Sequence, residues 1–237
     1  MSVEEGFTPH PFDRKNGVQT SGLIPGRFLR TGHINDRHST AYFGVAPSVV
    51  HSLLKRWLRT KPAARIEDFV FLDLGAGMGR AILLASEYPF RKVIGVELNP
   101  VLAGMARRNL AKWRADETIQ VPVKVIHGDA VSTPIPASPC LVFLFNPFGP
   151  SVMRRVVSRL AARFANRPGQ LDILYVNNEQ DRVIEMQSGF TRIFVGQVRR
   201  SRSDAIADHR IMANQPDGEY EATIYEDCSI WRWTGPS

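Results

Sequence analysis

A glycine-rich turn, Asp73-Leu74-Gly75-Ala76-Gly77-Met78-Gly79, is the segment of the sequence best suited to chemistry. It follows the apolar run 69–72 and precedes a segment with helical spacing that starts at Arg80. Glycine lets a backbone turn sharply and approach a ligand without a Cβ in the way, and a helix start presents unpaired N–H groups. The turn therefore predicts a cofactor site. Dinucleotide enzymes use G-x-G-x-x-G here, whereas these glycines fall at 75, 77 and 79.

Acidic residues follow the next two strand-like runs at the points where those runs end. Glu97 closes the run 93–97, 22 residues beyond Gly75, where a carboxylate can accept hydrogen bonds from both ribose hydroxyls of a nucleoside. Asp129 follows the run 121–127. Because ligands of open α/β sheets bind beyond the carboxyl ends of the strands, we expect both acids to reach the same site as the glycine turn. The alternatives are a solvated acid at a strand end and a common Gly-Asp turn.

A fourth strand-like run ends in Phe145-Asn146-Pro147-Phe148-Gly149-Pro150. Asn-Pro and Gly-Pro are turn formers, so one interpretation is a strand-to-helix turn without chemistry. The other follows from its place at a strand end, which faces the reacting group of a ligand bound there. Asn146 is therefore a candidate for contact with the substrate.

The D-x-G-x-G-x-G form of the turn resembles motif I of class I S-adenosylmethionine-dependent methyltransferases. The resemblance implies S-adenosylmethionine as the cofactor, with its methionine part on the turn and Asp73 orienting the strand end. It also implies that Glu97 binds the ribose, that Leu98 packs on the adenine, and that Asp129 accepts a hydrogen bond from the adenine amino group. The expected cofactor-binding residues are Asp73, Gly75, Ala76, Gly77, Gly79, Glu97, Leu98, Asp129, Ala130 and Asn146.

The turn at Asn146 resembles the N/D-P-P-Y/F motif of methyltransferases that act on amino or amide nitrogens, although the second proline is absent. It is also similar to the Phe-Gly-Pro-containing turn of non-SET histone-lysine methyltransferases. The resemblance covers about Phe69 to Pro150 and implies that the Asn146 side-chain oxygen and a backbone carbonyl hold the target N–H groups.

The segment Tyr42-Phe43-Gly44-Val45-Ala46-Pro47-Ser48 resembles an aromatic–Pro–Ser/Thr element of bacterial and mitochondrial protein-lysine methyltransferases. This resemblance implies that Tyr42 lies over the methyl group, where an aromatic face suits a sulfonium or ammonium. A core or surface tyrosine is the alternative. Asn146 and Tyr42 are thus the expected catalytic residues, and no general base is assigned.

The elements that must position these residues alternate between strand and helix. Such alternation predicts βαβ units and a mostly parallel sheet with helices on both faces. We expect a Rossmann-like α/β fold with seven strands, the last two forming an antiparallel hairpin at the sheet edge, joined by a long polar loop without a helix. The predicted strands are 69–72, 93–97, 121–127, 140–145, 171–176, 191–198 and 222–233; the predicted helices are 49–58 capped by Ser48, 80–87, 100–113 capped by Asn99, 151–164 and 181–187.

Residues 1–45 lack clear periodicity and carry Gly, Pro, Asn and His. We expect an irregular N-terminal arm here, with one short helix and a candidate role as a substrate lid. Residues 46–237 then form the S-adenosylmethionine-dependent methyltransferase domain.

The cysteines, Cys140 and Cys228, lie in strand-like segments without a CxxC pattern. This argues against a disulfide framework and a zinc site, so we expect no metal and a reducing, cytoplasmic location. The first residues lack the features of a signal peptide, and the longest apolar runs are too short to span a bilayer, so we expect no membrane association.

The formal net charge of +7 admits an acidic partner such as nucleic acid. Nucleic acid is the less favoured partner because the arginines are spread along the chain and most suit solvated helix faces. The stretch 199–202 is a denser basic segment that could contact an acidic substrate.

Three hypotheses remain open. The favoured one is a methyltransferase that acts on a nitrogen acceptor such as a protein lysine or a small amine. The alternatives are an RNA methyltransferase that uses the basic surface, and a non-catalytic cofactor-binding protein. The oligomeric state stays open.

Overall fold

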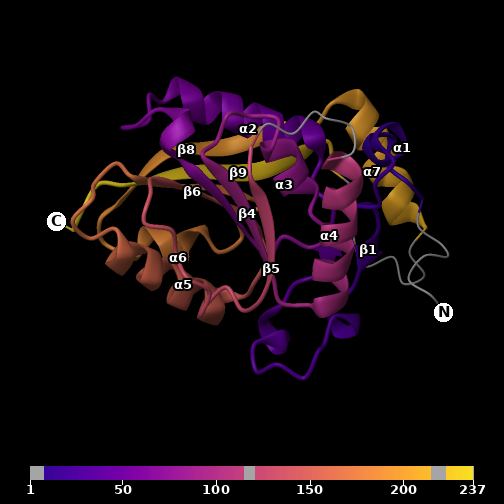
Figure 1. Cartoon of the computed structure of the whole chain (residues 1–237), viewed down its shortest axis with the longest axis horizontal. Coiled ribbons are helices and arrows are strands. Elements are labelled where there is room, and N and C mark those ends of the chain that lie inside the picture. The colour runs from indigo at the N-terminus through magenta and orange to yellow at the C-terminus, as the bar shows by residue number, and fades with distance from the viewer. Residues whose placement is uncertain (1–7, 115–120, 215–222, 237) are drawn as a thin grey trace.

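The computed structural model describes residues 8–114, 121–214 and 223–236. A seven-stranded sheet runs through it in the order β5-β4-β3-β6-β7-β9-β8 (Figure 1). The strands β3 to β7 are parallel, and β9 pairs antiparallel with both β7 and β8, which confirms the predicted sheet and its antiparallel edge. The bounds are β3 (Val70–Leu74), β4 (Lys92–Glu97), β5 (Val123–His127), β6 (Cys140–Phe145), β7 (Leu171–Val176), β8 (Phe190–Arg199) and β9 (Tyr225–Trp233).

Helices cover both faces of the sheet, as Figure 1 shows. On one face lie α2 (Pro47–Arg59), α3 (Arg80–Ala85) and α4 (Pro100–Arg114), whose buried side chains share an apolar cluster with alternate residues of the strands. On the other lie α5 (Pro150–Arg163) and α6 (Asp181–Glu185), which enclose a second cluster. Side chains alternate across a strand, so the parallel strands, buried on both faces, read as continuous apolar runs.

The parallel strands bring the predicted site residues to one edge of the sheet. β3 pairs with β4 on one side and with β6 on the other, so the chain order reverses at β3. In open α/β sheets such a reversal leaves a crevice beyond the strand ends. The glycine turn follows β3 at this place.

The N-terminal arm is more regular than expected. Its short helix is α1 (Pro11–Asn16), and β1 (Leu23–Ile24) pairs with β2 (Tyr42–Phe43) in a small antiparallel sheet. Two 3₁₀ turns, Gly26–Phe28 and Asp36–His38, lie between those strands. In Figure 1 part of the indigo arm lies below the lower end of α4. Residues 1–7 of the expected arm lie outside the described residues.

Two local predictions were wrong. The connection between β8 and β9 contains a helix, α7 (Arg202–Ala213), whose first turn Ser201 caps by accepting from the Asp204 N–H. Its buried positions include Asp204 and Asp208, so apolar periodicity did not reveal it. At the other site, α2 begins after Ala46, and Ser48 does not cap it. Instead the Ser48 hydroxyl accepts the Ser201 N–H at 2.8 Å, which ties the start of α2 to the start of α7.

The predicted cap of α4 is confirmed. Asn99 caps α4 through its side-chain oxygen, which accepts from the N–H groups of Val101 and Leu102.

The described helices include none that is both long and apolar enough to cross a membrane.

Candidate cofactor pocket

A pocket opens at the reversal point, between the ends of β3, β4, β5 and β6 and the N-terminal arm. Its walls contain most of the residues predicted for the site, namely Tyr42, Asp73, Gly75, Ala76, Gly77, Glu97, Leu98, Asp129 and Ala130. The lining does not include Gly79 or Asn146 among the described residues. Nine of the predicted residues thus line one pocket.

The glycine turn is held tightly by its neighbours. Gly75 and Gly77 both have positive φ, at 87° and 54°. A Cβ on Gly75 would lie 2.4 Å from the Cβ of Pro147, and one on Gly77 would lie 2.2 Å from the ring of Tyr42. The absent side chains therefore let this turn pack against the β6 loop and β2, in a backbone conformation that other residues rarely adopt.

Glu97 supports the turn directly. Its Oε2 accepts the Gly77 N–H at 2.7 Å and its Oε1 accepts the Asn99 N–H at 2.8 Å. Burial raises the pKa of Glu97, whereas these N–H groups lower it. For Asp73, burial and then the charge of Glu97 raise the pKa well above its usual range. The negative charge is therefore better stabilised on Glu97, which has two N–H donors.

Asp129 lies at the rim and is held from two sides. Its Oδ1 accepts the Val131 N–H and its Oδ2 accepts the Asn35 side-chain amide, both at 2.9 Å. Asn35 belongs to the arm and also lines the pocket. The arm therefore forms part of the wall near Asp129.

Asn146 follows β6 in a left-handed conformation, with φ at 39°, that asparagine tolerates better than most residues. Its backbone carbonyl accepts the Thr40 hydroxyl at 2.6 Å, and its Oδ1 accepts the Tyr175 hydroxyl at 3.2 Å. The side-chain oxygen expected to hold a substrate thus already accepts a hydrogen bond from within the protein. The wall here is formed by the adjacent residues Phe145, Pro147 and Phe148.

Tyr42 contributes its ring to the pocket and directs its hydroxyl elsewhere. The hydroxyl donates to the Thr20 carbonyl at 2.7 Å. Burial is the main cause that raises the Tyr42 pKa far above its ordinary value. Tyr42 is therefore a neutral aromatic wall packed on the glycine turn.

Sequence reasoning missed a group that ties the arm to the helix after the turn. Arg80 begins α3 and is buried, with its Nε donating to the Thr20 hydroxyl and its Nη2 to the Ser21 hydroxyl. Its guanidinium also lies 3.6 Å from the buried carboxylate of Asp13. The position of Arg80 directly after the glycines was the signal available in the sequence. Its partners in the arm, Asp13, Thr20 and Ser21, gave no such signal because their segment lacks periodicity.

No protein-family profile matches the sequence. Over 79 residues, 33% of this chain, the sequence is 38% identical to the adenine nucleotide translocase lysine N-methyltransferase of Mus musculus. The chain spans only 31% of the length of that relative.

Solved structures share the fold at low sequence identity. The [4+2]-cyclase SpnF superposes with a TM-score of 0.54 and 14% identity, over 78% of this chain and 82% of that one. HI0767 of Haemophilus influenzae, provisionally assigned as a methylase, gives a TM-score of 0.50 and 16% identity, over 78% and 88% of the two chains. The chain therefore shares a Rossmann-like fold with these proteins, and a third of it resembles a lysine N-methyltransferase in sequence.

Proposed function

We propose that this chain is an S-adenosylmethionine-dependent methyltransferase whose acceptor is an amine nitrogen of a protein lysine. The observation that carries the proposal is the convergence of the glycine turn, Glu97 and Asp129 on one pocket at the ends of parallel strands. Each of the three lies where it could contact a different part of a nucleoside that carries a charged tail.

The residues present fit this cofactor. Two acceptor carboxylates, Glu97 and Asp129, lie on successive strand ends and suit ribose hydroxyls and an adenine amino group. Leu98 and Leu102 add apolar surface on the same wall. Gly75 and Gly77 leave backbone rather than side chain facing the methionine part. When bound, the cofactor supplies an electrophilic methyl group on a sulfonium.

The acceptor side of the pocket is largely aromatic. Phe43, Phe145 and Phe148 line it together with the ring of Tyr42. Aromatic faces attract an ammonium or a sulfonium within about 6 Å, and an apolar lining limits the access of water. The protein contributes mainly alignment of donor and acceptor, which lowers the barrier without a strong base.

The preference for lysine rests on local sequence. The relative from mouse carries lysine N-methyltransferase in its name, and the Asn146 turn resembles that of non-SET lysine methyltransferases. A small amine would use the same aromatic wall. The basic surface leaves an RNA acceptor as the competing outcome.

Labelling of cell extract with radioactive S-adenosylmethionine and the purified protein tests the proposal. We expect label in protein, and methylated lysine after hydrolysis. Label in RNA would replace the acceptor, and label in small molecules would indicate a free amine. Tight cofactor binding without label in any fraction would overturn the enzymatic proposal and favour a non-catalytic binding protein.

A further inference from the structure

The N-terminal arm contributes one polar side chain that meets a predicted cofactor-binding residue directly. Asn35 is 6% exposed and lines the pocket. Its Nδ2 donates to Asp129 Oδ2 at 2.9 Å, across 94 positions of sequence. The local turn does not require this long-range contact between a buried amide and a pocket carboxylate. Its position in the pocket instead suggests a role in ligand binding.

The orientation of the Asn35 amide is fixed from both ends. Arg155 on α5 donates through Nη1 to Asn35 Oδ1 at 3.4 Å. A guanidinium can only donate and an ionised carboxylate can only accept. The amide oxygen must therefore face Arg155 while the amide nitrogen faces Asp129, and both contacts require the same orientation.

The loop that carries Asn35 is ordered by its own hydrogen bonds. The Asp36 carboxylate accepts the N–H groups of Thr31 and His33 at 2.6 and 2.9 Å. The Asn35 N–H donates to His33 Nδ1, and the Asn35 carbonyl accepts the His38 N–H. The position of Asn35 is therefore held by contacts within the protein.

Asp129 retains capacity for a further donor. An ionised carboxylate offers about four lone-pair sites, and the Val131 N–H and the Asn35 amide use two of them. The two partners hold different oxygens, so the carboxylate cannot rotate freely about its χ2 angle. A ligand amino group would meet a fixed acceptor.

We propose that Asn35 is a cofactor-recognition residue, which fixes the Asp129 carboxylate for an adenine amino group and holds the arm over that end of the pocket. The inference rests on the proposed function, because it assumes an adenosyl ligand. It adds a specificity-determining role for the arm that the strand-end motifs do not contain.

The same segment also reaches the other end of the pocket. Thr40, five positions later, donates to the Asn146 carbonyl, and the Gly149 N–H donates to the His38 carbonyl. Residues 35–40 thus span the distance from Asp129 to the β6 turn. Loss of the Asn35 contact should release one end of this span and leave the other attached.

Discrimination between two nucleosides provides the test. S-adenosylhomocysteine carries the amino group, whereas S-inosylhomocysteine carries a carbonyl oxygen that faces the carboxylate unfavourably. We expect the wild-type protein to prefer the adenosyl compound in calorimetric titrations. Asn35→Ala should weaken its binding about tenfold, the scale of one hydrogen bond to a charged group, and reduce the preference between the two compounds.

Two further variants separate recognition from folding. Asn35→Asp keeps the side-chain shape and places a second carboxylate against Asp129, so it should bind the adenosyl compound no better than Asn35→Ala. Asn16→Ala is the matched control, because Asn16 lies in the same arm and donates to the Phe12 carbonyl on α1. It should keep wild-type binding and preference.

The possible failures are distinguishable. If the wild-type protein binds neither compound, the proposed function fails. If the wild-type protein prefers the adenosyl compound and Asn35→Ala keeps the same ratio, the role of Asn35 is refuted while the proposed function stands. Retained affinity in Asn35→Asp would also refute it, because that variant has lost the donor and has gained a carboxylate that repels Asp129.

Discussion

At the ends of the neighbouring strands β3 and β4, the buried carboxylates of Asp73 and Glu97 line the same pocket and differ in how their charge is supported. Glu97 accepts two backbone N–H groups, whereas burial and Glu97 itself raise the pKa of Asp73 well above its usual range. The negative charge is therefore better supported on Glu97 than on Asp73.

This difference predicts unequal effects of two isosteric substitutions. In Glu97→Gln, one end of the amide must present an NH₂ to a backbone N–H, so the support of the turn is lost. We expect binding of S-adenosylhomocysteine to weaken roughly 10- to 100-fold, as for a hydrogen bond to a charged group. Because burial and the charge of Glu97 already disfavour the ionised form of Asp73 by raising its pKa, Asp73→Asn should change the affinity by less than about threefold. Equal losses in calorimetric titrations of the two variants would contradict the assignment.

The second prediction at this scale concerns Asn146, whose oxygens already contact Thr40 and Tyr175. Asn146→Ala removes the side-chain oxygen beside the acceptor wall. Because its Oδ1 accepts from the neutral Tyr175 hydroxyl, we expect the rate of methyl transfer to fall by up to about tenfold, the scale of one lost neutral hydrogen bond. The affinity for S-adenosylhomocysteine should stay nearly unchanged.

Asn177 supplies the matched control. It follows β7 with φ at 48°, so Asn177→Ala meets the same left-handed backbone strain. Its side chain donates to Glu179 rather than to a pocket element. If both alanine variants lose activity equally, backbone strain explains the effect and Asn146 has no separate role.

Among the elements, α7 is held by charges rather than by an apolar stripe. Asp208 is fully buried, with its Oδ2 3.4 Å from Arg200 Nε and its Oδ1 4.0 Å from His10 Nε2. Burial raises the Asp208 pKa to about 7, although the guanidinium groups of Arg200 and Arg80 lower it. The titratable and charged groups that face it are His10 at the N-cap of α1, Arg80 on α3, Arg200 directly after β8, Asp204 on α7 and Glu226 on β9.

A raised pKa makes stability depend on pH in a defined direction. The folded state keeps a proton on Asp208 that the unfolded chain releases near pH 4, so this contribution is complete at low pH and is lost as the pH rises to about 7. His10, whose pKa burial lowers to about 4, acts in the opposite direction. The difference between wild type and Asp208→Asn isolates the aspartate. Between pH 5 and 7 we expect the wild-type unfolding free energy to fall more steeply, by up to about 1.4 kcal/mol per pH unit.

Urea unfolding at several pH values measures this difference. Asp227→Asn on β9 is a suitable control, since Asp227 is exposed and close by. It should keep the wild-type slope. Parallel pH profiles for wild type and Asp208→Asn would show that Asp208 is ionised throughout.

The elements also show why some features were predictable from sequence. β3 and β6 are buried on both faces, so their continuous apolar runs were visible in the sequence. Glu97 and Asp129 could be predicted because they lie at or just after the ends of such strands. α7 was missed because it buries aspartates that neighbouring charges support. Asn35 and Thr40 were missed because their partners lie 94 and 106 positions away and their own segment has no period. Local pattern cannot encode such contacts.

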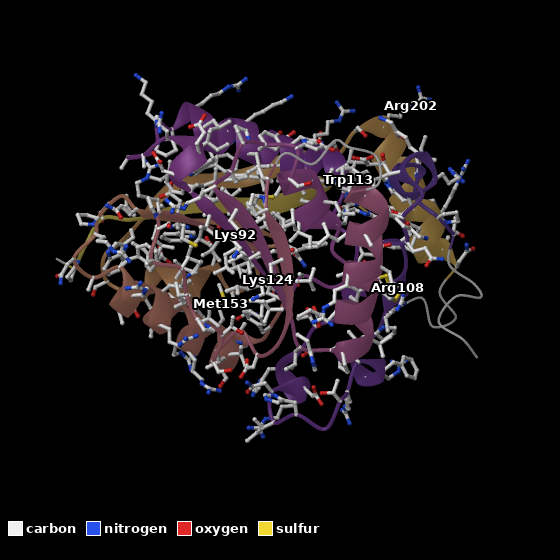
Figure 2. The ribbon with its side chains drawn as sticks, in the orientation of Figure 1. Lys92, Arg108, Trp113, Lys124, Met153 and Arg202 are labelled. Atoms are coloured by element: carbon white, nitrogen blue, oxygen red, sulfur yellow. The ribbon has the colours of Figure 1, made fainter. Side chains whose placement is uncertain are left out.

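Across the whole molecule, the part of the arm that lines the pocket and the basic stretch after β8 occupy different places. Figure 2 shows Arg202, at the start of α7, on the opposite side of the view from the arm loop beside α4. The arm completes the pocket wall, whereas residues 199–202 are absent from that wall as described. Cofactor binding should therefore stabilise the closed position of the arm against proteolysis.

Limited proteolysis can detect this coupling. Arg30 and Arg37 are exposed trypsin sites on the arm, on either side of the ordered turn at Asn35 and Asp36. If the arm must open for cleavage and opening releases the ligand, S-adenosylhomocysteine at 100 times its Kd should slow cleavage at these sites by up to about 100-fold. Arg65 precedes β3 and its side chain is 79% exposed, so it reports on the opposite edge of the sheet. Cleavage there should keep its rate. Equal protection of Arg65 would mean that the ligand stabilises the whole fold, and no change at Arg37 would mean that the arm opens independently of the pocket.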